Sequence, residues 1–216
     1  MSSQLKFDRH STVRSTLRCI AVLSVITIVC VVLLAVANKF MQVKVTLTKQ
    51  TSDMINTIAP TDTDNDTAFN QGYIKLVDLS AGEYAVTDLN KFNKQYGSTN
   101  QKVLALYTST NAQSGKVTYV VEAQGKGHVD AIVLLIAYNG VSVSAVKVKS
   151  QSESYWDKIT DYRDESGRDV FEMFIGTQGK VTGNQIATST GASNSLRGMA
   201  DAVSVANQFV ALIAEV

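Results

Sequence analysis

The clearest hydrophobic pattern in the chain lies near its C-terminus. Its apolar residues recur at steps of three and four, which is the period of one face of an α-helix. They are Leu196, Met199, Val203, Ala206, Val210 and Ile213. Asn194 or Ser193 is expected to cap this helix, because a short polar side chain can accept a hydrogen bond from the first turn. The pattern therefore predicts a long C-terminal helix that follows a loop of small and hydroxyl-bearing residues.

The middle of the chain is patterned for β-strands. Segments 103–107, 117–122, 131–138 and 141–145 are short and rich in apolar or β-branched residues. Asn139-Gly140 stands between the last two segments and predicts a type I′ hairpin. Helices are expected at 157–165 and 170–175, while 71–100 should hold one strand and one or two irregular helices. The fold class predicted is α+β, with an antiparallel sheet and flanking helices in undetermined strand order.

The alternation of the last strand changes phase at Val146 and Val148, which predicts a β-bulge. Lys147 and Lys149 are then expected to share the face opposite to these valines.

An uncharged run of Val, Leu, Ile and Ala predicts a transmembrane helix at 19–38. The positive-inside rule then places the tail 1–18 in the cytoplasm and the C-terminal domain outside it, in a single-pass protein that contacts membrane lipid. A cleaved signal peptide is the alternative, because residues 35–37 resemble a cleavage site. The apolar run is longer than the roughly 7–15 residues of a signal peptide, so an uncleaved anchor is favoured. The cations before the run are Lys6, Arg9, Arg14 and Arg18.

Residues 39–70 are expected to form a stalk and an acidic loop, followed by one folded domain at 71–216. Asp62, Asp64 and Asp66 resemble the opening of a calcium-binding EF-hand loop. The sixth position holds Thr67 instead of Gly, and the twelfth holds Tyr73 instead of Glu. A solvated acidic loop is the favoured interpretation, and no metal site is predicted.

Composition excludes several classes of function. The net charge is +1, and no basic patch indicates nucleic acid. Cys19 and Cys30 both lie in the apolar N-terminal run, so the folded domain has no cysteine for a disulfide, an iron–sulfur cluster or a nucleophile. His10 and His128 are the only histidines, which argues against a catalytic triad or a multi-histidine metal site. Any redox chemistry must therefore come from an organic cofactor.

The hydroxyl loop before the C-terminal helix carries the most specific motif, Thr190-Gly191-Ala192-Ser193-Asn194-Ser195. This hexapeptide resembles the motif of FMN-binding domains, found in the G subunit of Rnf-type electron-transport complexes and the C subunit of sodium-translocating NADH:quinone reductases. The resemblance implies that Ser193 carries FMN through a phosphoester, installed by an ApbE-type flavin transferase. Gly191 and Ala192 leave room for a close approach to the backbone, and the following helix N-terminus favours a phosphate.

The order of elements before this motif also resembles that family. Gly125-x-Gly127, two strands around Asn139-Gly140 and then a loop at Glu153 follow one another as they do there. The resemblance implies that Thr190 and Ser195 bond the phosphate or fix the loop. It also suggests that Glu153, Ser154 and Lys158 lie near the flavin ring. Trp156 is expected either to stack on that ring or to fill the core.

The function implied is a membrane-anchored flavoprotein subunit of an Rnf-type ion-translocating complex, relaying electrons to and from other membrane redox subunits. Such a subunit catalyses nothing alone, so its status as an enzyme stays open. Ala187 stands where the family usually has Asp. With the altered loop at Glu153, this motivates the alternative of a flavin-free tethered assembly or binding module. A stand-alone extracytoplasmic flavin carrier is a further alternative.

Overall fold

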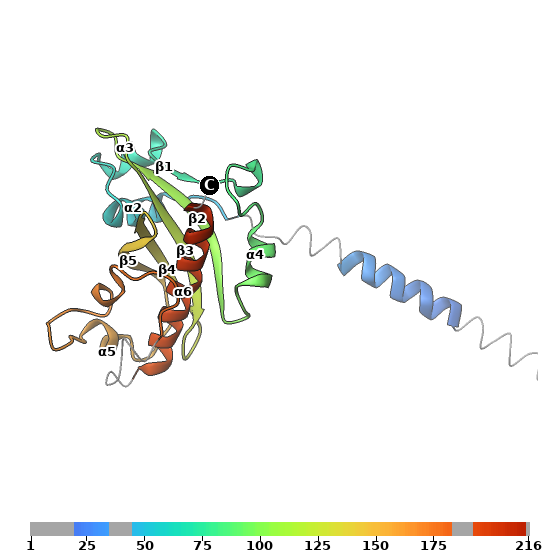
Figure 1. Cartoon of the computed structure of the whole chain (residues 1–216). Coiled ribbons are helices and arrows are strands. Elements are labelled where there is room, and N and C mark those ends of the chain that lie inside the picture. The colour runs from blue at the N-terminus through green and yellow to red at the C-terminus, as the bar shows by residue number, and fades with distance from the viewer. Residues whose placement is uncertain (1–19, 35–44, 183–191, 215–216) are drawn as a thin grey trace, which may run out of the picture. The chain divides into compact units, whose positions relative to one another are not determined.

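A computed structural model describes residues 20–34, 45–182 and 192–214 of the chain (Figure 1). The chain divides into two compact units, Met1–Lys44 and Val45–Val216. Within the first unit, residues 20–34 form a helix whose side chains are exposed. All elements of the site lie in the second unit.

The transmembrane helix expected at 19–38 is a wrong prediction. Across the described ranges, no helix combines the length and the apolar character needed to cross a membrane.

In the second unit, the described residues form a five-stranded antiparallel sheet in the order β1-β2-β3-β4-β5. The fold is therefore α+β, and each strand pairs with its neighbour in sequence. The four strands predicted in the middle of the chain are present but longer than predicted, because strand ends rich in polar residues carry no hydrophobic pattern. The strands are β1 (Ile74–Leu76), β2 (Gln101–Thr110), β3 (Val117–Lys126), β4 (Ala131–Asn139) and β5 (Ser142–Ser150).

The hairpin between β4 and β5 forms, but its turn lies one residue later than predicted. Asn139 pairs with Ser142, so Gly140 and Val141 are the two loop residues. Gly140 has a φ of 61°, and Val141 is not among the non-glycine residues of positive φ. Glycine first in the loop is typical of a type II′ turn, which corrects the type I′ prediction. The pairing shifts between Ala137 and Tyr138, which confirms a bulge in this hairpin.

One face of the sheet is covered by α2 (Lys49–Ile58) and α3 (Asn65–Asn70). Residues 45–70 therefore belong to the folded unit, where a stalk and loop were expected. Ile55 of α2 is fully buried against Ile74, Val120 and Leu135 of the sheet.

The acidic loop serves local structure. Asp64 caps α3 by accepting from the Thr67 N–H at 2.9 Å, and Asp66 pairs with Lys49 at 2.9 Å. Asp62 accepts a hydrogen bond from Asn111. Each carboxylate thus has a separate partner.

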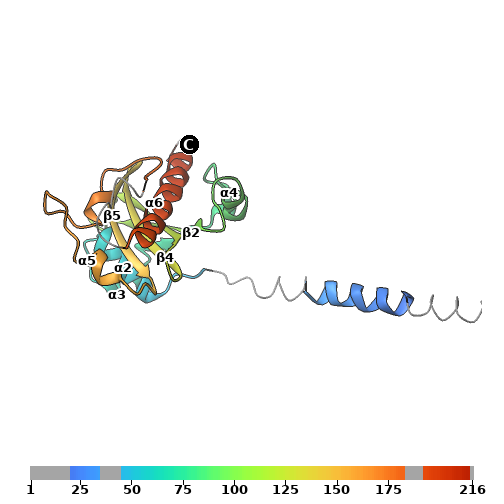
Figure 2. The same cartoon turned by 90° about the horizontal axis from the view of Figure 1, so that it is seen from below.

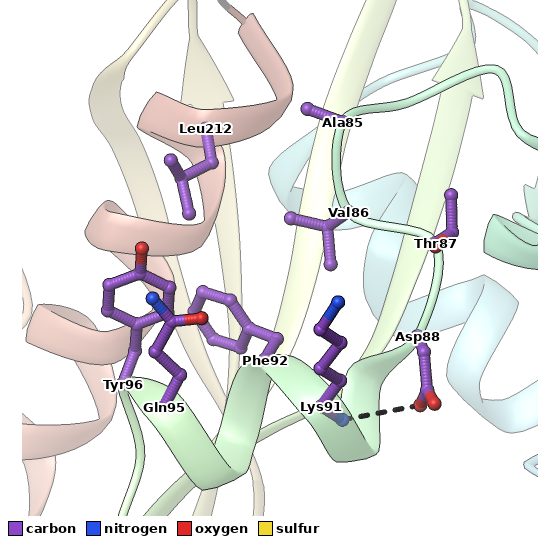
Figure 3. Close-up of a pocket in the computed structure, with 9 residues that line it drawn as sticks. All are labelled: Ala85, Val86, Thr87, Asp88, Lys91, Phe92, Gln95, Tyr96 and Leu212. Atoms are coloured by element: carbon purple, nitrogen blue, oxygen red, sulfur yellow. Dashed lines mark hydrogen bonds between the residues drawn. The ribbon is translucent and has the colours of Figure 1, made fainter.

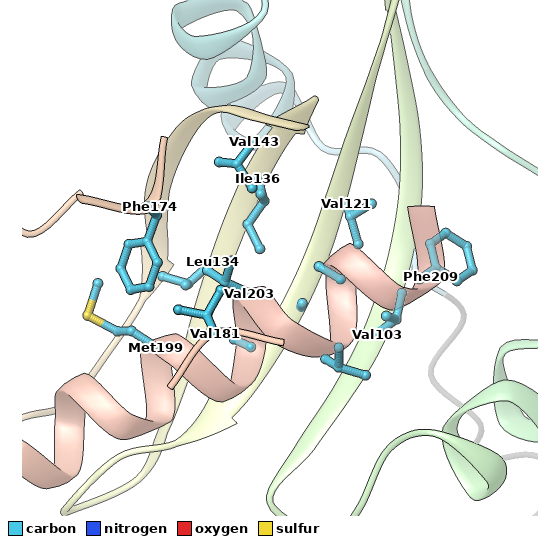
Figure 4. Close-up of a cluster of buried hydrophobic side chains, with 14 of the residues drawn as sticks. Val103, Val121, Leu134, Ile136, Val143, Phe174, Val181, Met199, Val203 and Phe209 are labelled. Carbon is cyan, nitrogen blue, oxygen red and sulfur yellow. The ribbon is translucent and has the colours of Figure 1, made fainter. Parts of the chain in front are cut away.

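The other face of the sheet is covered by α6 (Ser193–Ala214), as Figures 1 and 2 show. It confirms the long C-terminal helix that was predicted from the periodicity of the apolar residues. Its apolar face, together with Phe174 and Val181, packs on side chains that alternate along the central strands (Figure 4). Burial of this continuous apolar cluster supplies the main driving force for the unit. Its labelled members on the sheet are Val103, Val121, Leu134, Ile136 and Val143.

The N-terminal part of α6 approaches the sheet closely at two glycines. A Cβ on Gly125 of β3 would overlap the backbone of Gly198, and a Cβ on Gly198 would overlap the Lys126 carbonyl group. A side chain at either position would push the helix and the strand apart. The two glycines therefore determine where the start of α6 packs on the end of β3.

The remaining helices are short. α4 (Leu89–Gln95) packs beside the C-terminal half of α6, with Phe92 and Phe209 rings 5.2 Å apart between centroids. A helix expected at 157–165 is only α5 (Trp156–Thr160), because Asp161 ends it before the turn at Gly167. The apolar segment 170–175 forms the single 3-10 turn η2 (Glu172–Phe174), and another such turn, η1 (Leu79–Ala81), follows β1.

Candidate functional site

Helix α6 begins at the predicted FMN-attachment residue. Ser193 is its first residue, and the first intrahelical hydrogen bond runs from the Leu196 N–H to the Ala192 carbonyl at 3.1 Å. The cap position is therefore held by Ala192, and the expected caps Ser193 and Asn194 lie inside the first turn. Ser193 and Asn194 are both exposed, so their side chains project from the positive end of the helix dipole.

Ser195 points the other way, into the protein. It is 3% exposed, and its hydroxyl donates a hydrogen bond to Glu153 Oε2. Ser195 and Glu153 were both predicted to lie at the site, and the structure brings them into direct contact. This contact holds the first turn of α6 against the loop that follows β5.

Glu153 also binds the turn between β3 and β4. Its carboxylate accepts from the backbone N–H groups of His128 at 2.9 Å, Val129 at 3.0 Å and Asp130 at 3.3 Å. Gly127 is required beside it, because a Cβ there would overlap Glu153 Oε1. One buried carboxylate thus joins three segments that are far apart in the sequence.

These hydrogen bonds decide the ionisation of Glu153. Burial acts to raise the pKa of its carboxyl group, but hydrogen bonds from Ser195 and from the N–H groups of residues 128–130 outweigh it. The pKa is therefore lowered from the ordinary value of 4.5. At neutral pH Glu153 is therefore an anion, and its charge is stabilised by the Ser195 hydroxyl and the backbone N–H groups of residues 128–130. Glu153 lies on the inner side of the helix N-terminus, whereas Ser193 lies on the exposed side.

A cavity of about 120 Å³ opens at this helix N-terminus. It is lined by His128, Tyr155, Ala192, Ser193, Asn194 and Ser195. Four of its six lining residues come from the hydroxyl motif, and the others come from the β3–β4 turn and the start of α5. The predicted residues Thr190 and Gly191, and Ala187, lie outside the described residues.

Polar and cationic groups surround the exposed side of this cavity. Arg197 donates to Asn194 Oδ1 at 2.6 Å, and the Asn194 amide nitrogen lies 3.4 Å from His128 Nδ1. Lys158 Nζ lies 4.6 Å from the centre of the Tyr155 ring. Such groups can stabilise a phosphate diester, which keeps one negative charge.

The predicted ring contacts take different positions. Ser154 and Lys158 are both exposed, whereas Glu153 is buried behind Ser195. Trp156 packs on the hydrophobic core, with its ring centroid 6.5 Å from that of Phe171. Of the two roles considered for this tryptophan, the structure supports the core role.

Sequence reasoning missed two residues that line the cavity. Tyr155 was not selected because a tyrosine beside a tryptophan carries no signal of its own, and its proximity to Ser193 depends on the Glu153–Ser195 contact. His128 follows a Gly-x-Gly turn, which predicts only a change of chain direction. Its occurrence as the only histidine after residue 10 is the one signal that pointed to it.

Two larger cavities lie elsewhere along α6 and involve none of the motif residues. One, of about 220 Å³, lies between α4 and Leu212 near the far end of the helix, with Phe92 and Tyr96 on its floor (Figure 3). The other, of about 560 Å³, is lined by polar residues that include Lys180 and Asp201. Burial raises the pKa of Asp201, and the charges of Arg197 and Lys180 oppose this shift.

A second buried carboxylate lies on β3. Glu122 accepts from the Tyr107 hydroxyl at 2.7 Å and pairs with Lys149 Nζ at 2.8 Å. Burial first, and then the Glu122 charge, raise the pKa of Tyr107 well above its ordinary value. Tyr107 packs in the cluster beneath α2, so this ion pair belongs to the sheet face opposite α6.

Searches against protein-family models, curated proteins and solved structures found nothing that matches this chain. The residues of the site and their geometry therefore carry the functional argument.

Proposed function

We propose that residues 45–216 form an electron-transfer domain that carries FMN on Ser193. The observation that carries this proposal is the placement of the exposed Ser193 hydroxyl at the first residue of a 22-residue helix, on the wall of a cavity. The proposal combines this geometry with the resemblance of residues 190–195 to the flavin-attachment motif. In keeping with that resemblance, the domain would serve in an electron-transport complex of the Rnf type.

The residues present fit a phosphoester. The N–H groups that precede the first intrahelical bond, together with the helix dipole, favour an anion at this end of α6. Arg197 lies one turn after Ser193 and is exposed. One of its N–H groups binds Asn194 Oδ1, and the guanidinium group has further N–H donors for a phosphate oxygen. The donor would be a flavin dinucleotide, in which FMN is joined to a nucleoside monophosphate through a diphosphate. The Ser193 Oγ would form a bond to the FMN phosphorus as the diphosphate P–O bond breaks, so that the nucleoside monophosphate leaves and the hydroxyl proton is released.

The remaining residues of the site would position this group. Glu153 and Ser195 hold the first turn of α6 against the sheet, and Gly125 and Gly198 allow the close backbone contact beneath it. The bound flavin would supply the redox chemistry, while the protein supplies attachment, orientation and electrostatics. Redox partner subunits would deliver and remove the electrons.

The proposal is tested by co-expression with an ApbE-type flavin transferase. The denatured gel band of the wild-type chain should show flavin fluorescence, because a phosphoester survives denaturation. Ser193→Ala should abolish the fluorescence, whereas the matched variant Thr190→Ala should retain it. A colourless wild-type band would refute the proposal and would favour the flavin-free binding module. Fluorescence that persists in Ser193→Ala would place the attachment elsewhere.

A further inference from the structure

An exposed aromatic ring lies beside the proposed attachment residue. Among the exposed large apolar side chains described in the second unit, Tyr155 is the only aromatic one, and it is 52% exposed. Tyr155 lines the same cavity as Ser193. Its neighbour Trp156 is packed on the core. The exposure of Tyr155 is therefore not explained by packing.

The position of Tyr155 is fixed by the backbone around it. It immediately precedes α5, whose Ile159 is fully buried, and it lies two residues after the buried Glu153. Both anchors restrict the backbone of Tyr155, while its ring faces solvent at the start of α6. A ring that is held in place and exposed offers a flat surface at a low cost in conformational entropy.

A cation accompanies this ring. Lys158 Nζ lies 4.6 Å from the ring centre, a cation–π distance. No carboxylate is paired with Lys158 among the described ion pairs. The ammonium group therefore brings a positive charge next to the mouth of the cavity.

The cavity beside Ser193 is too small to enclose a whole flavin. Its volume of about 120 Å³ is well below the roughly 300–1,000 Å³ of pockets that enclose a drug-sized ligand. It is suited to a phosphate and the start of a chain attached to it. A tricyclic ring system joined to Ser193 would consequently lie over the surface at the cavity mouth, where Tyr155 is exposed.

We propose that Tyr155 and Lys158 form a platform for the isoalloxazine ring of FMN attached at Ser193, an inference that rests on the function proposed above. The Tyr155 ring stacks on the flavin, since offset stacking of aromatic rings is favourable. The Lys158 ammonium group stabilises the negative charge that the flavin gains on reduction. Tyr155 thus orients the flavin, and Lys158 raises its midpoint potential.

The test compares flavinylated full-length proteins in the folded state and in denaturant. A stacked tyrosine quenches flavin fluorescence, so the wild-type signal should rise several-fold on unfolding. Tyr155→Ala should be as bright when folded as when unfolded, and Tyr155→Trp should restore quenching. Lys158→Gln should keep the quenching and shift the midpoint potential to a more negative value. Because both side chains are exposed, the denaturation midpoint should stay near that of the wild type.

The outcomes separate this inference from the proposal on which it rests. A wild-type chain that accepts no flavin overturns both. A flavinylated chain in which Tyr155→Ala remains quenched, while folded normally, overturns the platform and leaves the attachment at Ser193 intact. An unchanged potential in Lys158→Gln removes the electrostatic role of that lysine.

Discussion

The Ser195 hydroxyl donates a hydrogen bond to the carboxylate of Glu153, although the two residues are separated by 42 positions in the chain. The same carboxylate accepts N–H groups from the turn between β3 and β4. The start of α6, the loop after β5 and this turn are therefore held as one unit. Ser193, two residues before Ser195, owes its placement to that unit.

Loss of this contact should destabilise the domain. Ser195→Ala leaves a buried carboxylate with one donor fewer, which costs about 1–3 kcal/mol for a hydrogen bond to a charged group. Urea denaturation followed by circular dichroism measures the change. Ser193→Ala is the matched control, because an exposed serine in the same turn should change stability by less than about 0.5 kcal/mol. Equal effects of the two substitutions would contradict the role given to Ser195.

The lowered pKa of Glu153 predicts a dependence of stability on pH. Its folded-state pKa lies below the ordinary value of 4.5, so ionised Glu153 stabilises the fold at higher pH. This contribution is lost as the pH falls below about 4.5 towards the folded-state pKa. Thermal unfolding between pH 3 and 7 should show a loss of stability in the wild type that is reduced in Glu153→Gln. If stability falls by the same amount with pH in the wild type and in Glu153→Gln, the titration of Glu153 is not the cause of the pH dependence.

Gly198 should resist replacement even by alanine. A helix interior usually gains about 1 kcal/mol from Gly→Ala, but here the new Cβ would overlap the Lys126 carbonyl group. We expect Gly198→Ala to lower the free energy of unfolding by about 1–3 kcal/mol, the usual cost of overpacking. Chemical denaturation shows whether Gly198→Ala lowers or raises the free energy of unfolding. Arg197→Ala, at the exposed neighbouring position, serves as the control, and stabilisation by Gly198→Ala would disprove the close contact.

A buried hydrogen bond joins the sheet to the middle of α6. The Tyr138 hydroxyl donates to Asn207 Oδ1 at 2.8 Å, and Asn207 Nδ2 donates to the Gly179 carbonyl at 3.0 Å. Tyr138→Phe removes the donor and leaves the buried amide oxygen unpaired, at a cost of about 1–3 kcal/mol. Denaturant titration of Tyr138→Phe measures this cost. The exposed Tyr155→Phe should be nearly neutral in the same assay.

Much of the folded unit was predictable from local pattern. The periodicity of α6 and the alternation along β4 and β5 identify their elements, because one face of each is buried against a common core. The hairpin turn was displaced by one residue, since Gly140 can occupy either central position of a two-residue loop. α2 was assigned to a stalk because its apolar residues Met54, Ile55 and Ile58 stand between the expected anchor and the acidic loop, and its packing on the sheet depends on long-range contacts.

The site was predictable in part. The motif points to Ser193 as the proposed attachment residue, and the resemblance to a family points separately to Glu153 and Ser195. Their contact could not be predicted, because it depends on the register of β3, β4 and β5 and on the Gly125–Gly198 approach. The same long-range geometry brings Tyr155 and His128 to the cavity, and neither has a local pattern that indicates it.

Every functional role proposed above depends on the attachment of FMN to Ser193. Attachment can be measured by intact-mass spectrometry of the chain co-expressed with a flavin transferase, followed by peptide mapping. We expect a mass increase equal to FMN less one water, located on Ser193, absent from Ser193→Ala and retained in Ser193→Thr. The bare polypeptide mass in the wild type, or the added mass on another residue, would contradict it.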